Sequence, residues 1–218
     1  MLGKTHMVTT GSIMTGAVCA SYTVFQNAGL SSTYLGSVNN VFMTYLGIEW
    51  PDKSLVVDTG LSFDILYLGL LCHLFSIVAL SVFGSLLPDI DTSTSTLGRF
   101  VPFIGAIIPH RTITHTIWII LVFGIGIFCF GGNAYIIAVW IGYILHIVED
   151  TFSKQGIAWF YPIDGYRTYG SGAVVKRGRN PKFFYYRTGS DREIGIFYVM
   201  LVFWIIFIIR LLYLLYFK

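Results

Sequence analysis

The chain has 218 residues, of which 55% are hydrophobic, 17% aromatic and only 11% charged. This composition excludes an ordinary soluble domain and is typical of an integral membrane protein. The formal net charge of +3 carries little information as a total, because charges in membrane proteins act loop by loop.

Five apolar segments follow one another along the chain. They are residues 7–28, 65–87, 116–130, 134–149 and 195–217. The first is softened by Thr and Ser and follows Lys4, so a signal peptide is the alternative interpretation, although cleavage would remove His6. The segments predict an all-α, polytopic membrane protein with about five transmembrane helices, forming a single domain over residues 1–218.

Two connections between these segments have distinctive sequences. Gly131-Gly132-Asn133 separates the third segment from the fourth and predicts a tight helical hairpin. The apolar stretch 100–108 is only about nine residues long, which is too short to cross a bilayer. We therefore expect 100–108 to be a re-entrant or interfacial element.

Basic residues concentrate in the loop 151–193 and predict the orientation of the chain. They are Lys154, Arg167, Lys176, Arg177, Arg179, Lys182, Arg187 and Arg192. The positive-inside rule places this loop in the cytoplasm, together with the N-terminus and residues 88–115, whereas residues 29–64 face outward. Anionic lipids are the expected partners of the basic stretch 166–192, and no nucleic acid is needed to explain it.

With this topology, seven side chains of metal-ligand type fall at cytoplasmic helix ends. They are His6, Asp89, Asp91, His110, His115, His146 and Asp150. Polar groups at membrane depth are costly, and a bound metal is the simplest reason for so many. A hydrogen bond between His146 and Asp150, or a helix-ending turn at Asp89 and Asp91, would explain each pair alone. The convergence of four chain segments favours the metal.

The spacing within the pairs adds detail. His146 and Asp150 are four residues apart and share one helix face. His110 and His115 would lie about 140° apart on one helix, so one of them, most simply His110 after Pro109, is expected to precede the helix. Thr112 or Thr114 would then cap its start. His73, midway along an apolar segment, is expected to be a packed core histidine.

Imidazole and carboxylate ligands suit zinc, with manganese or iron as alternatives. Cys19, Cys72 and Cys129 are scattered through apolar segments, so no thiolate site is predicted. Seven candidate ligands exceed the needs of one zinc ion. We therefore predict two or three divalent ions, and paired metals recur in the hydrolysis of phosphate esters.

Three short motifs in this order resemble the YdjM-type family. They are Leu87-Pro88-Asp89-Ile90-Asp91, His110-Arg111-Thr112-Ile113-Thr114-His115 and His146-Ile147-Val148-Glu149-Asp150, preceded by Lys4-Thr5-His6. That family is described as LexA-binding or LexA-regulated inner-membrane, metal-dependent hydrolases. The wider resemblance is to zinc-dependent phospholipase C. Both resemblances imply that the ligands include His6, Asp89, His110 or His115, His146 and Asp150.

The leading hypothesis is a membrane-bound hydrolase that cleaves a phosphoester of a membrane lipid at the cytoplasmic face, using a metal-activated water. Asp91 or Asp150 would be the general base if it is not a ligand. Arg111, with Arg99 as a second candidate, would hold the phosphate, because a guanidinium binds it bidentately.

Three other functions compete with this hypothesis. A divalent metal-ion transporter would need ligands near the bilayer midplane, with access from both sides. A lipid phosphatase with a histidine nucleophile would need Ser-Arg where Val139 and Trp140 stand. A non-enzymatic membrane regulator would use the basic loop.

Overall fold

The computed structural model describes residues 3–27, 61–108, 110–153, 156–163, 167–168, 174–175 and 186–216. The helices in this part are α1 (Gly3–Asn27), α3 (Leu61–Gly84), α4 (Pro102–Ile107), α5 (Ile117–Phe130), α6 (Ala134–Thr151) and α7 (Asp191–Tyr216). Three short 3₁₀ helices join them: η1 (Pro88–Asp91), η2 (Gly98–Phe100) and η3 (Ile113–His115). The strands described, β1 (Arg167–Thr168) and β2 (Val174–Val175), form one small antiparallel ladder.

The predicted all-α membrane class is confirmed. Among the described residues, three helical segments are long and apolar enough to cross a membrane: Cys72–Asp91, Ala134–Thr151 and Asp191–Leu214. Helix α5 is apolar but shorter. Each of the five predicted segments coincides with a helix, and α3 begins at Leu61, four residues before its predicted start. The count of five membrane crossings remains a prediction.

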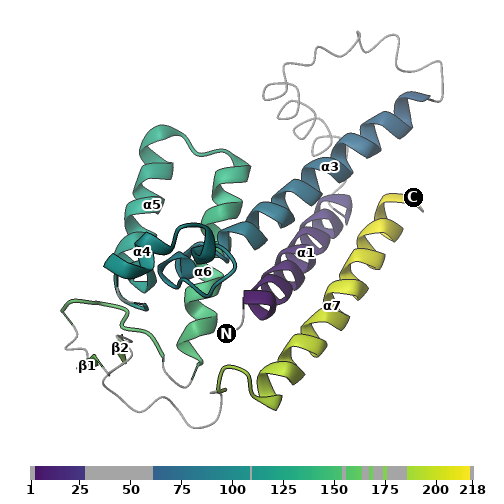
Figure 1. Ribbon diagram of the computed structural model, residues 1–218. Helices are drawn as coiled ribbons and strands as arrows, with labels where there is room; N and C mark the ends of the chain where they lie inside the picture. The colour runs from purple at the N-terminus through teal and green to yellow at the C-terminus, as the bar shows by residue number, and fades with distance from the viewer. Residues whose placement is uncertain are drawn as a thin grey trace.

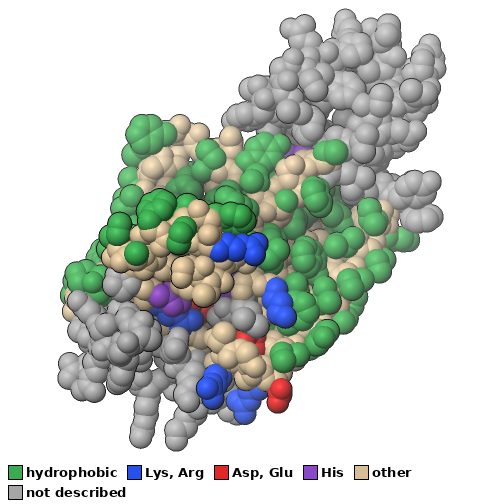
Figure 2. Space-filling view, viewed as in Figure 1, with side chains coloured by type: hydrophobic (Ala, Val, Ile, Leu, Met, Phe, Trp, Pro, Cys, Tyr) green, Lys and Arg blue, Asp and Glu red, His purple; other side chains and the backbone are tan. Residues whose placement is uncertain are grey.

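The helices form two connected groups. In Figure 1, α1 lies between α3 and α7, and the three long helices run side by side. Helix α6 packs against α3 and also forms a hairpin with α5. Hydrophobic side chains cover much of the long-helix surface in Figure 2, whereas Lys and Arg side chains gather toward one end of the bundle.

Local sequence explains the α5–α6 hairpin, which was predicted. Gly131 ends α5 with a left-handed backbone, φ 73°, a conformation that glycine adopts without steric cost. The side-chain oxygen of Asn133 accepts hydrogen bonds from the backbone N–H groups of Tyr135 and Ile136, both at 3.0 Å, and so caps α6.

Glycines bring α3 and α6 into backbone contact. A Cβ atom at Gly142 would overlap the backbone oxygen of Ser81, and one at Gly84 would overlap the backbone oxygen of Val139. The absence of both side chains allows the two helices to pack closely. As a result, the end of α3 lies against the middle of α6, and the carbonyl of Ser85, just beyond α3, reaches His146 in the site.

The stretch 100–108 folds as the short helix α4, flanked by η2. Helix α4 packs on η1 and η2, yet Phe103 and Ile107 remain 62% and 76% exposed. This arrangement fits the expected re-entrant or interfacial element. The predictions for the outward loop 29–64, apart from its last four residues, and for most of the basic stretch 166–192 lie outside the described residues.

Candidate metal centre

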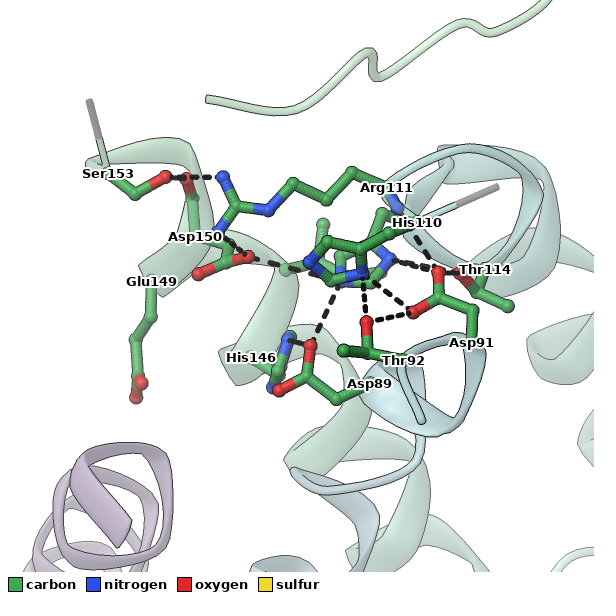
Figure 3. Close-up of polar contacts among 12 residues, drawn as sticks. Asp89, Asp91, Thr92, His110, Arg111, Thr114, His146, Glu149, Asp150 and Ser153 are labelled. Atoms are coloured by element: carbon green, nitrogen blue, oxygen red, sulfur yellow. Dashed lines mark hydrogen bonds and ion pairs between the residues drawn. The ribbon is translucent and has the colours of Figure 1, made fainter. Parts of the chain in front are cut away.

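All seven predicted ligand residues lie in one cluster. Three overlapping triads have ligand atoms within 4.8 Å of one another. They are His6–His146–Asp150, Asp89–His115–His146 and Asp91–His110–His115. Figure 3 shows Asp89 beside His146, with His110 and Asp91 on one side and Asp150 on the other. Four segments distant in the sequence therefore converge at one end of the helices.

Each segment reaches the cluster from a helix end. His6 lies in the first turn of α1, and His146 and Asp150 lie at the C-terminal end of α6. Asp89 and Asp91 belong to η1, which follows α3 after three residues. Pro88 begins η1, because a proline cannot donate the hydrogen bond that would continue α3.

Three imidazole nitrogens in the centre have no hydrogen-bond partner in the described part of the chain. They are the buried Nε2 atoms of His6, His115 and His146. Their Nδ1 atoms are all bound: His6 to Glu149 Oε2 at 2.6 Å, His115 to Thr114 Oγ1 at 2.9 Å and His146 to the Ser85 carbonyl at 2.6 Å. In the neutral ring, an Nδ1–H donor leaves a lone pair on Nε2, which is the form that binds a metal.

Two carboxylates lie next to these nitrogens. Asp89 Oδ1 is 3.7 Å from His115 Nε2 and 3.6 Å from His146 Nε2. Asp150 Oδ1 is 3.5 Å from His6 Nε2, and its Oδ2 is 3.9 Å from His115 Nε2. The His6 and His146 rings are stacked, with centroids 3.8 Å apart. Buried polar atoms normally have hydrogen-bond partners, so three unpaired nitrogens beside two carboxylates fit a bound cation.

The charge of the centre also favours a cation. Besides Asp89 and Asp150 it contains Asp91 and Glu149, and among the described residues the guanidinium of Arg111 pairs with Asp150. Burial lowers the pKa of His115, but the carboxylates of Asp89 and Asp91 outweigh burial and raise that pKa to about 9. The raised pKa means that the surrounding carboxylates favour a positive charge at His115. A divalent ion would compete with the proton for its Nε2.

Asp91 differs from the other carboxylates because protein donors surround it. Its Oδ1 accepts from His110 Nδ1 at 2.7 Å and from Thr92 Oγ1 at 3.1 Å. Its Oδ2 accepts from Thr114 Oγ1 at 2.5 Å and from the backbone N–H of Arg111 at 3.1 Å. These contacts fix the loop before α5 to η1. They favour Asp91 as an anchor of this loop over the predicted roles of ligand or general base.

Arg111 is buried and its contacts are internal. Its Nη2 lies 2.7 Å from Asp150 Oδ2, and its Nη1 donates to Ser153 Oγ at 2.9 Å and to the Gly156 carbonyl at 3.1 Å. Figure 3 shows the side chain extending from the Asp91 side of the centre to Asp150 and Ser153. Arg111 thus positions Asp150, and this geometry does not favour the predicted role of holding a phosphate.

The backbone of Arg111 is unusual. Its φ of 62° is the one positive value among the described non-glycine residues. Such a conformation costs of order 1–3 kcal/mol and persists only where surrounding contacts impose it. Here the contacts to Asp91 and Asp150 impose it from both ends of the residue.

The loop before α5 corrects part of the spacing argument. Both His110 and His115, not one of them, precede α5, and His115 lies in η3. Thr116 occupies the cap position without a side-chain hydrogen bond, and Thr114 binds Asp91 instead. The expected cap at Thr112 or Thr114 is therefore wrong, because this loop is held by the site and not by the helix start.

Sequence reasoning missed two supporting groups, Glu149 and the carbonyl of Ser85. Glu149 accepts from His6 and is buried. A signal for Glu149 was present, since a carboxylate at the end of an apolar helix needs a partner. No sequence signal identifies the Ser85 carbonyl, because every residue has one. His73 lies apart from the centre and pairs with Tyr135 at 2.9 Å.

Most of these residues lie within a match to a known family: the model of the YdjM inner membrane protein family matches residues 59–216. The chain belongs to this family. The match confirms the resemblance found in the motifs, and it supports the predicted location in the inner membrane. It includes every residue of the centre except His6, which the structure adds from α1. No curated protein and no solved structure matches the chain.

Proposed function

We propose that this protein is a membrane-bound, metal-dependent hydrolase that cleaves a phosphoester of a membrane lipid. The observation that carries the proposal is the set of three buried Nε2 atoms, from His6, His115 and His146, beside two carboxylates. This donor set suits zinc first, and manganese or iron next.

The geometry limits the number of ions. The Nδ1 of His146 is taken by the Ser85 carbonyl, so His146 offers one nitrogen, which binds one ion at a time. Two of the triads share His146, and they therefore compete. These two triads therefore hold one ion between them. A second ion, in the Asp91–His110–His115 triad, would have to displace the donors that surround Asp91, so this arrangement favours one ion over the predicted two or three.

The chemistry follows from these ligands. A divalent metal bound there would polarise a phosphoryl oxygen and lower the pKa of a water molecule. Arg111 holds Asp150 in place, and Asp91 holds the loop that carries His110 and His115. His110 is 30% exposed, so this ring lies at the solvent-facing side of the centre. Of the two predicted phosphate-binding arginines, Arg99 is exposed, with its guanidinium 5.0 Å from the Phe100 ring.

A lipid substrate is supported by the apolar surface on the segments that build the centre. Phe100, Phe103 and Ile107, on or beside α4, are 72%, 62% and 76% exposed. Trp118 and Phe160, which meet edge to face at 6.3 Å, are also exposed. Aromatic side chains of this kind are typical of the membrane interface. A substrate with its acyl chain in the bilayer could present its phosphate there.

The cytoplasmic face is the proposed side. Lys and Arg side chains gather toward one end of the bundle in Figure 2, and Lys4, Arg111 and Arg192 lie in segments of the site end. The positive-inside rule then favours a cytoplasmic centre, with anionic lipids as neighbours of the basic stretch.

One observation favours metal transport as a second candidate. Helix α1 buries five hydroxyl side chains, those of Thr5, Thr9, Thr10, Ser12 and Thr15, along the length that continues from His6. Polar side chains buried in a membrane helix need a reason, although the hydroxyls of Thr9 and Thr15 donate to the backbone carbonyls of Thr5 and Gly11. Against transport, the ligands crowd at one end of the helices and not at their middle.

The test uses protein purified in detergent. Metal content is measured first, and a panel of phospholipids and prenyl phosphates is then assayed with and without a chelator. We expect bound zinc or a similar ion, chelator-sensitive release of product, and little activity on freely soluble phosphoesters. If the metal-loaded protein releases no product but carries labelled metal into liposomes, the hydrolase proposal is wrong and the transporter proposal takes its place.

A further inference from the structure

Glu149 makes a contact that none of the predicted roles explains. Its Oε2 lies 2.6 Å from His6 Nδ1, although the two residues are 143 positions apart in the chain. Both are buried, with 0% of the His6 side chain and 9% of the Glu149 side chain exposed. Glu149 immediately precedes Asp150 at the end of α6. The contact therefore joins α1 to the end of α6 within the centre.

The direction of the hydrogen bond determines what His6 offers to the centre. A carboxylate only accepts, so the His6 Nδ1 donates its proton, and the ring presents an Nε2 lone pair. That Nε2 is buried, unpaired and 3.5 Å from Asp150 Oδ1. Metal-binding histidines commonly donate their other nitrogen to a carboxylate, which fixes the tautomer and ring orientation and raises the basicity of the ligand.

Other contacts do not fix the ring in the same way. His6 stacks on His146 with centroids 3.8 Å apart and an interplanar angle of 23°, and stacking alone leaves the tautomer undetermined. His115 and His146 are oriented by neutral groups, Thr114 Oγ1 and the Ser85 carbonyl. Among the three buried imidazoles, His6 is the one whose Nδ1 hydrogen-bonds to a carboxylate, at 2.6 Å, whereas the Asp91 carboxylate is 3.5 Å from His115 Nδ1.

We propose that Glu149 is a positioning residue of the metal centre, which holds His6 as a ligand and thereby makes α1 part of the site. The proposal rests on the metal centre of the proposed function and not on the identity of the substrate. It also explains why a residue outside the family match, His6, joins ligands that lie within it.

A double-mutant cycle on Zn²⁺ affinity tests this role. The full-length protein in detergent is compared with Glu149→Ala, Glu149→Gln, His6→Ala and the Glu149→Ala/His6→Ala double variant, using competition with a chromophoric chelator. We expect Glu149→Ala to weaken binding by about 10–100-fold. Glu149→Gln should lose less, because its amide oxygen still accepts from Nδ1. Adding Glu149→Ala to His6→Ala should change the affinity by less than about twofold, since the effect passes through His6.

The absorption spectrum of the Co²⁺-substituted protein supplies a second readout. Glu149→Ala and His6→Ala should perturb the spectrum in the same way, because both lose the same nitrogen ligand. The matched control is Glu193→Ala, which removes another buried carboxylate, one that accepts from the backbone N–H of Gly189 in the turn before α7. This control should leave Zn²⁺ affinity and the Co²⁺ spectrum unchanged.

Several results would overturn the proposal. Wild-type Zn²⁺ affinity in Glu149→Ala would do so, as would an equal loss of affinity with and without His6. If Glu149→Ala does not fold, Glu149→Gln decides, because its amide keeps the acceptor but loses the charge that raises the basicity of His6: affinity and a Co²⁺ spectrum both equal to wild type would refute the role proposed for the carboxylate. If the wild-type protein binds neither Zn²⁺ nor Co²⁺, the proposed metal centre is refuted. If the wild type binds metal but the Glu149 variants behave like it, only the role of Glu149 is refuted, so the two results are distinguishable.

Discussion

Buried histidines occur in two regions of the helix bundle, and their surroundings differ. His73 on α3 is 5% exposed, and its Nδ1 lies 2.9 Å from the hydroxyl of Tyr135 at the start of α6. His146 lies 11 residues further along α6 and is fully buried, but it stacks on His6 and lies 3.6 Å from Asp89. One region holds a lone imidazole, and the other holds several with carboxylates between them.

This difference shows that burial of a histidine does not by itself indicate a metal ligand. His73 is satisfied by one neutral partner and has no carboxylate neighbour among the described groups that could hold a metal. In the centre, second partners fix Nδ1 and leave Nε2 unpaired beside carboxylates. The arrangement of both ring nitrogens distinguishes the two cases.

The largest expected effect concerns the sides of the membrane on which the two regions lie. With all three native cysteines replaced, single cysteines are placed at Ser93, near the centre, and at Ala134, near Tyr135; both positions are exposed. In intact cells, Ala134→Cys should react with a membrane-impermeant maleimide and Ser93→Cys only after permeabilisation, because basic residues favour the inside. The reverse pattern would place the centre outside.

The next effect is loss of metal from one region only. His146→Ala should reduce Zn²⁺ affinity by more than the roughly 10–100-fold expected for losing a supporting residue, because it removes a nitrogen that two triads share. His73→Ala is the matched control and should retain its metal. Metal content by elemental analysis of the purified variants measures both. Equal metal content in the two variants would indicate that the polar contacts of the centre are structural and that His146 is not a metal ligand.

Arg111 tests what stabilises the centre in the absence of metal. Arg111→Ala leaves Asp150 as a buried charge without its guanidinium, and removing one partner of a buried pair costs roughly 3–5 kcal/mol. Thermal unfolding of metal-free protein in detergent should show the loss, whereas Arg111→Lys keeps the charge and should retain metal with lower turnover. Wild-type stability of Arg111→Ala would contradict the positioning role of this side chain.

The smallest effect tests the helix contact that brings the regions together. Gly142→Ala would push its Cβ into the Ser81 carbonyl and separate α3 from α6. Overpacking of this kind costs about 1–3 kcal/mol, and Zn²⁺ affinity should fall because Ser85 and Asp89 move away from His146. Gly126→Ala in α5 meets nothing within 4 Å and should be neutral or slightly stabilising. Equal behaviour of the two variants in unfolding and binding assays would refute the close-contact argument.

The membrane class, the helical segments and the seven candidate ligands of the centre could be predicted from the sequence. Apolar runs and the Gly131-Gly132-Asn133 turn are local signals, so the helices and the α5–α6 hairpin were predictable. The rarity of ionisable residues made His146 and Asp150 conspicuous candidates, and alternating helix directions predicted which ends would meet.

The role of each group in the centre depends on the packing of distant segments and could not be predicted from the sequence. Asp89 and Asp91 are two residues apart and chemically identical, yet Asp89 lies between imidazoles and Asp91 is surrounded by hydrogen-bond donors. Arg111 points into the protein toward Asp150, and Glu149 supports a histidine from the other end of the chain. Local sequence encodes helix formation, whereas the partner of a buried polar atom depends on which distant segment packs against it.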